Sequence, residues 1–319
     1  MVIDKQEKID SLKPGVPPIF VLAFGILAIS TASLFIRYAQ QTAPSLVIAA
    51  YRLAIATLVL SVPALLRRRE EIRSIQGKRL GLVVLSGIFL GFHFATWITS
   101  LEYTSVASSV VLVTTAPLWV ALLSPLFLHE RLSKFALVGL LVALAGGVIV
   151  GLSQGCSLEN GLSCPSLGGF FQGRAFLGNL LALAGALFAA FYVMIGRSVR
   201  ANLSLTTYTF TVYGIAALTL LIMVGVSGKS MLGYPPVSYV WFAALALVPQ
   251  LLGHSSLNWA LRYLKAAYVS VAQLGEPVGS VILAYLIMGE SPNALELSGG
   301  ILILTGIFFA TRAEKKETK

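Results

Sequence analysis

Ten stretches of mostly apolar residues divide this chain, and each is about long enough to cross a bilayer. A helix that spans the hydrocarbon core needs about 20 such residues. The runs are continuous and lack the period-two alternation of barrel strands, which favours helices over a barrel. The stretches lie near residues 18–36, 44–66, 80–101, 105–127, 134–152, 175–196, 205–226, 237–260, 265–288 and 293–312. The sequence therefore predicts an all-α integral membrane protein with ten transmembrane helices.

Composition points the same way. Only 11% of the 319 residues are charged, against about 25% in a typical soluble domain, so lipid has to be the solvent for much of the surface. The net charge of +10 would suit nucleic-acid binding, but the basic residues lie in short loops and tails, where they orient a membrane protein. We therefore expect membrane lipid, and no nucleic acid, among the partners. The basic run 67–79 is expected to set orientation and to touch anionic lipid.

Lysine and arginine are distributed unevenly between the two faces. If the N-terminus is cytoplasmic, 19 of the 23 basic residues fall in inside segments, whereas Arg37, Arg174 and Lys229 fall outside and Arg52 lies within a helix. Cytoplasmic segments of membrane proteins carry such an excess. We predict a multi-pass protein of the plasma (inner) membrane with both termini cytoplasmic. No cleaved signal peptide is evident, so the first apolar run is expected to remain as a helix.

The two cysteines, Cys156 and Cys164, both fall in the longest loop, between the fifth and sixth helices. The predicted topology puts this loop outside, where a disulfide can persist. The loop is either a small extracellular flap or, as we favour, a stapled linker. Two cysteines are too few ligands for a metal site, so we expect none.

The two halves of the chain repeat each other. A constant offset of 160 aligns the last two helices of each half without a gap. Matches between apolar residues are common by chance, but this offset also pairs other residue types: Tyr103–Tyr263, Pro117–Pro277, Glu130–Glu290, Gly139–Gly299 and Gly146–Gly306. An offset of 162 pairs Tyr51 with Tyr213 and Trp97 with Trp259. Because each repeat holds five helices, an odd number, the second repeat enters the membrane from the opposite face. The sequence thus predicts an inverted repeat, an arrangement that suits exchange between outward-open and inward-open cavities.

The ends of the fourth and ninth helices, APLWVALLSPLFLHERLS and GEPVGSVILAYLIMGESPN, share a mid-helix proline, an apolar run and a terminal glutamate. In this pattern and in its five-plus-five helices the chain resembles the drug/metabolite transporter superfamily, in particular its EamA-type members. The resemblance implies a first repeat over 18–152, an outer loop over 153–174, a second repeat over 175–312, and cytoplasmic tails at 1–17 and 313–319. That family exports amino acids and other metabolites and includes nucleotide-sugar carriers and plastid phosphate translocators, so the fold alone fixes no cargo.

One acid lies in the middle of a predicted span. Glu276 precedes Pro277, whose ring removes a backbone hydrogen bond, and the matched position in the fourth helix has Pro117 without an acid. A proline-interrupted pair in two repeats points to a site near the bilayer midplane. Glu276 either exchanges a proton or a cationic substrate group, or pairs permanently with a basic side chain.

The remaining candidates share the interior of the predicted bundle. Arg52 would clamp a carboxylate or phosphate of the cargo, snorkel outward, or bind Glu276. His93 and His254 either titrate near neutral pH or simply satisfy hydrogen-bond acceptors. The side chains expected to line an amphipathic cavity are Tyr51, Trp97, Tyr213, Trp259 and Gln273. Trp259 is better explained as an interface anchor. For Glu130 and Glu290, at helix ends, a capping or turn role is favoured over gating.

These observations favour a transporter over an enzyme. The chain has no GxxxxGK[ST] loop for ATP, and one isolated acid is too little for a membrane-embedded transferase. We expect a secondary active or facilitative carrier of a small molecule, working by alternating access and exporting an amino acid or a similar amphipathic metabolite. A channel or a transferase is the alternative. We expect no cofactor, with proton coupling left open, and the sequence does not decide substrate, direction or oligomeric state.

Overall fold

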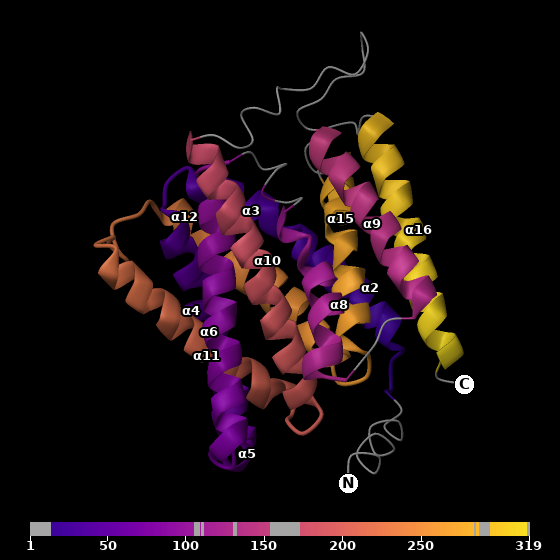
Figure 1. The fold of residues 1–319 in the computed structure, drawn as a ribbon. Coiled ribbons are helices and arrows are strands. Elements are labelled where there is room, and N and C mark those ends of the chain that lie inside the picture. Colours follow the sequence, from indigo (N-terminus) through magenta and orange to yellow (C-terminus); the bar gives the residue numbers. More distant parts are fainter. Residues whose placement is uncertain are drawn as a thin grey trace.

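The computed structural model describes residues 14–104, 109, 112–129, 133–153, 173–283, 285–286 and 294–317, and all regular elements there are helical (Figure 1). The first repeat contributes α2 (Pro18–Ser30), α3 (Ala32–Gln40), α4 (Ser45–Arg67), α5 (Arg69–Arg73), α6 (Gly77–Ser100), α8 (Ala116–Phe127) and α9 (Lys134–Ser153). The second repeat contributes α10 (Gly173–Arg200), α11 (Leu205–Val226), α12 (Pro236–Leu245), the π-helix η2 (Ala246–His254), α13 (Ser255–Ala260), α14 (Ala266–Ala272), the 3₁₀ turn η3 (Gln273–Gly275), α15 (Glu276–Leu283) and α16 (Ala294–Glu317).

Six helical stretches among the described residues are long and apolar enough to cross a membrane. They are Pro18–Gln40, Ser45–Arg67, Gly77–Ser100, Phe176–Arg200, Leu205–Val226 and Pro236–Ala260. Three shorter apolar helices accompany them, at Ala116–Phe127, Lys134–Ile149 and Leu297–Phe309. The all-helical, multi-pass character predicted from the sequence is confirmed, whereas the count of ten spans stays a prediction.

Large apolar side chains point outward from the bundle. Leu66, Val226 and Phe20 are 79%, 85% and 67% exposed, while many of the fully buried positions are alanines. Such a surface suits lipid, and small residues let helices approach closely when lipid removes the hydrophobic drive for them to associate. The apolar outer surface therefore follows from the same composition that predicted a membrane protein.

Helices α9 and α16 show this close packing most clearly. A Cβ on Gly146 would lie 2.5 Å from the carbonyl oxygen of Gly299, and one on Gly306 would lie 2.4 Å from that of Gly139. The lower-numbered glycine of each helix thus meets the higher-numbered glycine of the other, so these matched helices of the two repeats run antiparallel. This is the relation expected between the last helices of two inverted repeats.

Contacts between the repeats come in pairs: where a helix of one repeat contacts a helix of the other, the two corresponding helices with the repeats exchanged are also in contact. Helix α10 packs against α6 and α8, and the corresponding helix of the first repeat, α2, packs against η2, α13 and α15. The glycine contacts obey the same exchange. A Cβ on Gly25 would meet Ser256, and one on Gly185, 160 positions later, would meet Thr96, which is 160 positions before Ser256. We call α6, α8 and α10 the first group, and α2, η2, α13, α14 and α15 the second group.

The bundle has two distinguishable ends (Figure 1). The terminal end holds the start of α2, the short helix α5 and the end of α16, at the bottom of the view. The far end holds the end of α3, the end of α6 and the start of α10. A candidate site between the two groups is framed by broken helices. The fourth predicted span is helical at 112–113 and turns at 114–115 before α8 begins, the ninth is divided into α14, η3 and α15, and η2 interrupts the eighth.

Candidate functional site

A cavity lies between the first and second groups and is lined by residues of both. It contains about 830 Å³ of space free of atoms, including the part that is open to the outside. Seven of the residues singled out from the sequence line it, namely Arg52, His93, Trp97, Pro117, His254, Gln273 and Glu276. Residues from α2, α4, α6, α8, α10, α13, α14 and α15 thus meet at one place.

Arg52 is carried into the interior by α4 and is completely buried. Its Nε donates a hydrogen bond to Oε1 of Gln250 over 2.8 Å, and its guanidinium carbon lies 4.2 Å from the centre of the Phe94 ring. Neither Nη1 nor Nη2 has a hydrogen-bond partner in the part of the chain that the structure describes. A buried cation is costly unless it is paired, so these two nitrogens are available to an acceptor that the described residues do not supply.

Glu276 is placed by the break in the ninth span. It is the first residue of α15, immediately after η3, and its backbone carbonyl accepts a hydrogen bond from Oγ of Ser30 over 3.0 Å. The carboxylate lines the same cavity as Arg52, yet the two form no ion pair within 4.0 Å among the described side chains. The cavity therefore holds one positive and one negative group that do not neutralise each other by direct contact.

The two histidines flank the arginine. Nδ1 of His93 lies 2.9 Å from the carbonyl oxygen of Gly185, so Nδ1 carries the proton and donates it. The His93 ring stacks on Trp97, and His254 packs edge-on against Phe94, the same ring that covers Arg52. The contact to Gly185 agrees with the interpretation of His93 as a side chain that satisfies a backbone acceptor.

The sequence argument did not identify three polar residues at this site. Gln250 holds Arg52, Asn258 donates to the hydroxyls of Tyr192 and Tyr213, and Ser270 lines the cavity. Gln250 directly follows Pro249 inside a span, which is the same pattern of polar residue beside proline that drew attention to Glu276. That signal would have found Gln250, whereas nothing in the sequence distinguishes Asn258 or Ser270.

Other predicted residues lie elsewhere. The Tyr51 hydroxyl donates to the carbonyl of Met231 and its ring stacks on Phe242, so it does not line the cavity. Tyr213 is buried behind the lining, with its hydroxyl 3.5 Å from Oγ of Ser255. Pro277 occupies the second position of α15, and Trp259 packs on Tyr263. Cys156, Cys164, Glu130 and Glu290 lie outside the described residues.

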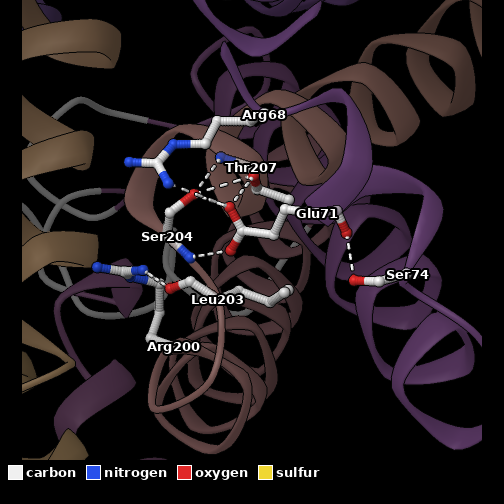
Figure 2. Close-up of polar contacts among 7 residues, drawn as sticks. All are labelled: Arg68, Glu71, Ser74, Arg200, Leu203, Ser204 and Thr207. Atoms are coloured by element: carbon white, nitrogen blue, oxygen red, sulfur yellow. Dashed lines mark hydrogen bonds and ion pairs between the residues drawn. The ribbon is translucent and has the colours of Figure 1, made fainter.

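A polar network ties the repeats together at the terminal end, as Figure 2 shows. Glu71 of α5 accepts hydrogen bonds from the backbone N–H and hydroxyl of Ser204, both 2.6 Å, and from the hydroxyl of Thr207 at 2.8 Å. Arg68 lies 3.9 Å away. Burial alone raises the pKa of the Glu71 carboxyl, but the hydrogen bonds from Ser204 and Thr207, with the charge of Arg68, outweigh it and lower the pKa below its ordinary value.

The chemistry of the cavity follows from its unpaired atoms. In the described part of the chain, the buried donors of the cavity lining without partners include Nη1 and Nη2 of Arg52 and Nε1 of Trp97, against one pure acceptor, Oδ1 of Asn258. The site therefore favours an acceptor-rich, anionic group beside Arg52, while Glu276 suits a cationic one. No cluster of three His, Cys, Asp or Glu side chains occurs among these residues.

Comparison with known proteins bears on this arrangement. A family model described as the EamA-like transporter family matches residues 16–152 and again 176–312. A Bacillus subtilis protein named uncharacterized transporter YdfC is 24% identical over 274 residues, which cover 85% of this chain and 83% of its own length. The pseudopaline exporter CntI of Pseudomonas aeruginosa is 25% identical over 308 residues, covering 96% and 99%. A solved crystal structure with 19% identity superposes with a TM-score of 0.75, covering 94% of this chain and 98% of its own, and shares the fold.

Proposed function

Because this chain belongs to the EamA-like transporter family, we propose that it exports a small amphipathic metabolite, such as an amino acid, by alternating access. The cargo binds in the cavity between the two groups. It is released after the groups tilt relative to each other around it. The chain works as a secondary or facilitative carrier in the plasma (inner) membrane, with the terminal end facing the cytoplasm, as the excess of Lys and Arg at that end supports.

The observation that carries this proposal is the incomplete pairing of Arg52. Its two Nη atoms are buried and have no partner among the described residues, and Arg52 lines the cavity. A planar carboxylate fits two parallel N–H donors of a guanidinium. Glu276, which lines the same cavity from α15, then takes the ammonium of the same molecule, and Trp97 offers apolar surface to its side chain.

Two features support a carrier that exports. The exchanged contacts give the molecule two nearly equivalent groups, which is what an exchange of conformations needs and a channel does not. The relative named as a pseudopaline exporter matches this chain over almost its entire length. Glu276 is the side chain through which a proton would be coupled, if transport is driven uphill.

Binding and counterflow test the proposal. Purified protein is first screened by thermal shift against the L-amino acids and small carboxylates, because a ligand stabilises the state that it binds. The best stabiliser is then used for counterflow in proteoliposomes. Saturable counterflow is the expected result, whereas conductance without counterflow would identify a channel.

Arg52→Gln should reduce both signals. We expect at least a tenfold loss of counterflow and no thermal shift with the stabilising compound, since a hydrogen bond to a charged group contributes about 1.5–3 kcal/mol and 1.4 kcal/mol is tenfold in affinity. Arg37→Gln makes the same chemical change at an exposed position of α3 and serves as the matched control. Full binding by the Arg52 variant would show that the guanidinium does not hold the cargo.

A further inference from the structure

At each end of the molecule, one hydrogen bond between the two groups of helices has a counterpart at the other end. At the far end, Nε2 of Gln40 donates to the carbonyl oxygen of Ile98 over 3.3 Å. At the terminal end, Nε of Arg200 donates to the carbonyl oxygen of Asn258 over 2.9 Å. The contacts of Gly25 and Gly185 relate these helices by an offset of 160, and not by the 162 that pairs Trp97 with Trp259 in the sequence. The offset of 160 converts Gln40 into Arg200 and Ile98 into Asn258. The two bonds are therefore the same contact, made once by each repeat.

The acceptors are equivalent in detail. Ile98 and Asn258 are both the third residue from the end of their helices, α6 and α13. The backbone N–H that would bond to each carbonyl in a continuing helix belongs to Glu102 or Arg262, and it bonds instead to the next carbonyl along. Each helix end thus leaves one carbonyl oxygen for a side chain from the opposite group.

Both bonds cross the boundary where the cavity would open. Gln40 ends α3, which continues α2 of the second group, and Ile98 belongs to the first group. Arg200 ends α10 of the first group, and Asn258 belongs to the second. Separating the groups at either end has to break the bond at that end. We propose that Gln40 and Arg200 are a symmetry-related pair of gate residues, each holding one end of the transport pathway closed.

The pair is unequal in strength. Gln40 is neutral and shares its amide between Ile98 and Oγ of Ser45. Arg200 is charged, almost completely buried, and also donates to the carbonyl of Leu203. One turn earlier, Arg197 donates to the carbonyls of Leu261 and Arg262 over 3.1 and 3.3 Å.

Charged hydrogen bonds are roughly twice as strong as neutral ones, and cations are favoured at the carboxyl ends of helices. The terminal-end gate is therefore the stronger one. It follows that the unliganded protein opens more readily at its far end.

Accessibility of one cavity residue to a membrane-impermeant maleimide tests this inference. Cys156 and Cys164 are replaced by serine, and Ser270→Cys, a near-isosteric change in the cavity lining, becomes the reporter. The reagent is added to each face of sealed vesicles in turn. Single cysteines at exposed Ser74, at the terminal end, and exposed Ser230, at the far end, identify which face is which without any assumption about topology.

The gate variants should change labelling in opposite directions. Arg200→Gln is expected to raise the labelling rate from the terminal-end face about tenfold, and Gln40→Ala to raise it from the far-end face about threefold. Gln40→Arg should lower far-end labelling. Arg200→Lys, which keeps the charge, should lie between Arg200→Gln and the parent, and Arg37→Gln should match the parent. If Arg200→Gln does not fold, the two Gln40 variants decide alone, because they must shift far-end labelling in opposite senses.

Unchanged labelling in the folded variants would overturn the gate assignment. The inference rests on the proposed alternating access, but it fails separately. Labelling that shifts as expected in a protein without counterflow would contradict the transport function alone. Normal counterflow with unchanged labelling would contradict the gates alone.

Discussion

Arg52 is a buried cation to which the described residues supply one neutral acceptor and one aromatic face. Gln250 and Phe94 fix the direction of the guanidinium without neutralising it. An aromatic face contributes about 0.5–2 kcal/mol to a cation, which is far below the cost of burying an unpaired charge. Both side chains therefore position Arg52 for a further anionic partner.

Glu71 gives a second prediction at the scale of single residues. Glu71→Gln removes a charged acceptor from the start of α11 and should destabilise the protein by about 1–2 kcal/mol, the usual effect of losing a helix cap. The melting temperature in detergent should fall by a few degrees, since 1 kcal/mol corresponds to about 2–4 °C in a chain of this size. Glu70→Gln changes the exposed neighbouring residue and should have little effect.

The effect of Glu71 should depend on pH in a defined direction. Because the folded-state pKa of Glu71 is lowered, its contribution is complete above the unfolded pKa, about 4.3, and disappears as pH falls through the folded value. The difference in melting temperature between the parent and Glu71→Gln should thus be constant from pH 7 to about 5 and shrink below pH 4. A difference that grows on acidification would contradict this role.

At the scale of elements, the contact of α9 with α16 depends on the absence of side chains. Gly146→Ala would place a Cβ 2.5 Å from one backbone atom and 2.8 Å from another, and neither can move without shifting a helix. We expect a loss of about 1–3 kcal/mol, as for other overpacked interiors.

Gly147→Ala is the matched control, because nothing lies within 4 Å of its Cβ. This substitution should be neutral or stabilise by up to about 1 kcal/mol through the better helix propensity of alanine. Thermal unfolding of the two variants in the same detergent compares them directly. Equal melting temperatures would show that the two helices separate easily.

How far the sequence predicts the elements varies along the chain. Hydropathy predicted a helix at 205–226, and α11 has these bounds. The prediction succeeds because the apolar run begins directly after a capping serine, Ser204, and ends at a turn. Hydropathy could not show the π-helix η2 or the turn at 114–115 that precedes α8, because both depend on backbone hydrogen bonds and leave the apolar run unbroken. The Arg52–Gln250 contact spans 198 positions, and only packing brings such residues together.

At the scale of the whole molecule, each group of helices takes members from both repeats. The first group combines α6 and α8 with α10, and the second combines α2 with η2, α13, α14 and α15. Neither repeat could therefore form the cavity alone, and the repeats matched by the family model, 16–152 and 176–312, are units of sequence rather than of packing.

Orientation is a prediction about the molecule as a whole. Green fluorescent protein fused after Lys319 should fluoresce in a bacterial host, because the basic terminal end is expected to stay in the cytoplasm. Alkaline phosphatase should be inactive at that position and active when inserted in the loop 227–235. The reverse pattern of activities would place the terminal end outside.

The unequal gates also limit what this protein can do by itself. If the closed terminal end is favoured, the state that accepts cargo from that side is a minor one, and the apparent dissociation constant there rises in proportion to its rarity. The cargo concentration that half-saturates the protein therefore differs between the two faces of the membrane. Without a coupled ion, however, the free energies around the cycle must sum to zero, so the maximal rates compensate and equal concentrations give no net flux. The difference between Gln40 and Arg200 would suit a carrier whose cargo is concentrated in the cytoplasm and scarce outside. The direction of net transport remains set by the concentration gradient of the cargo.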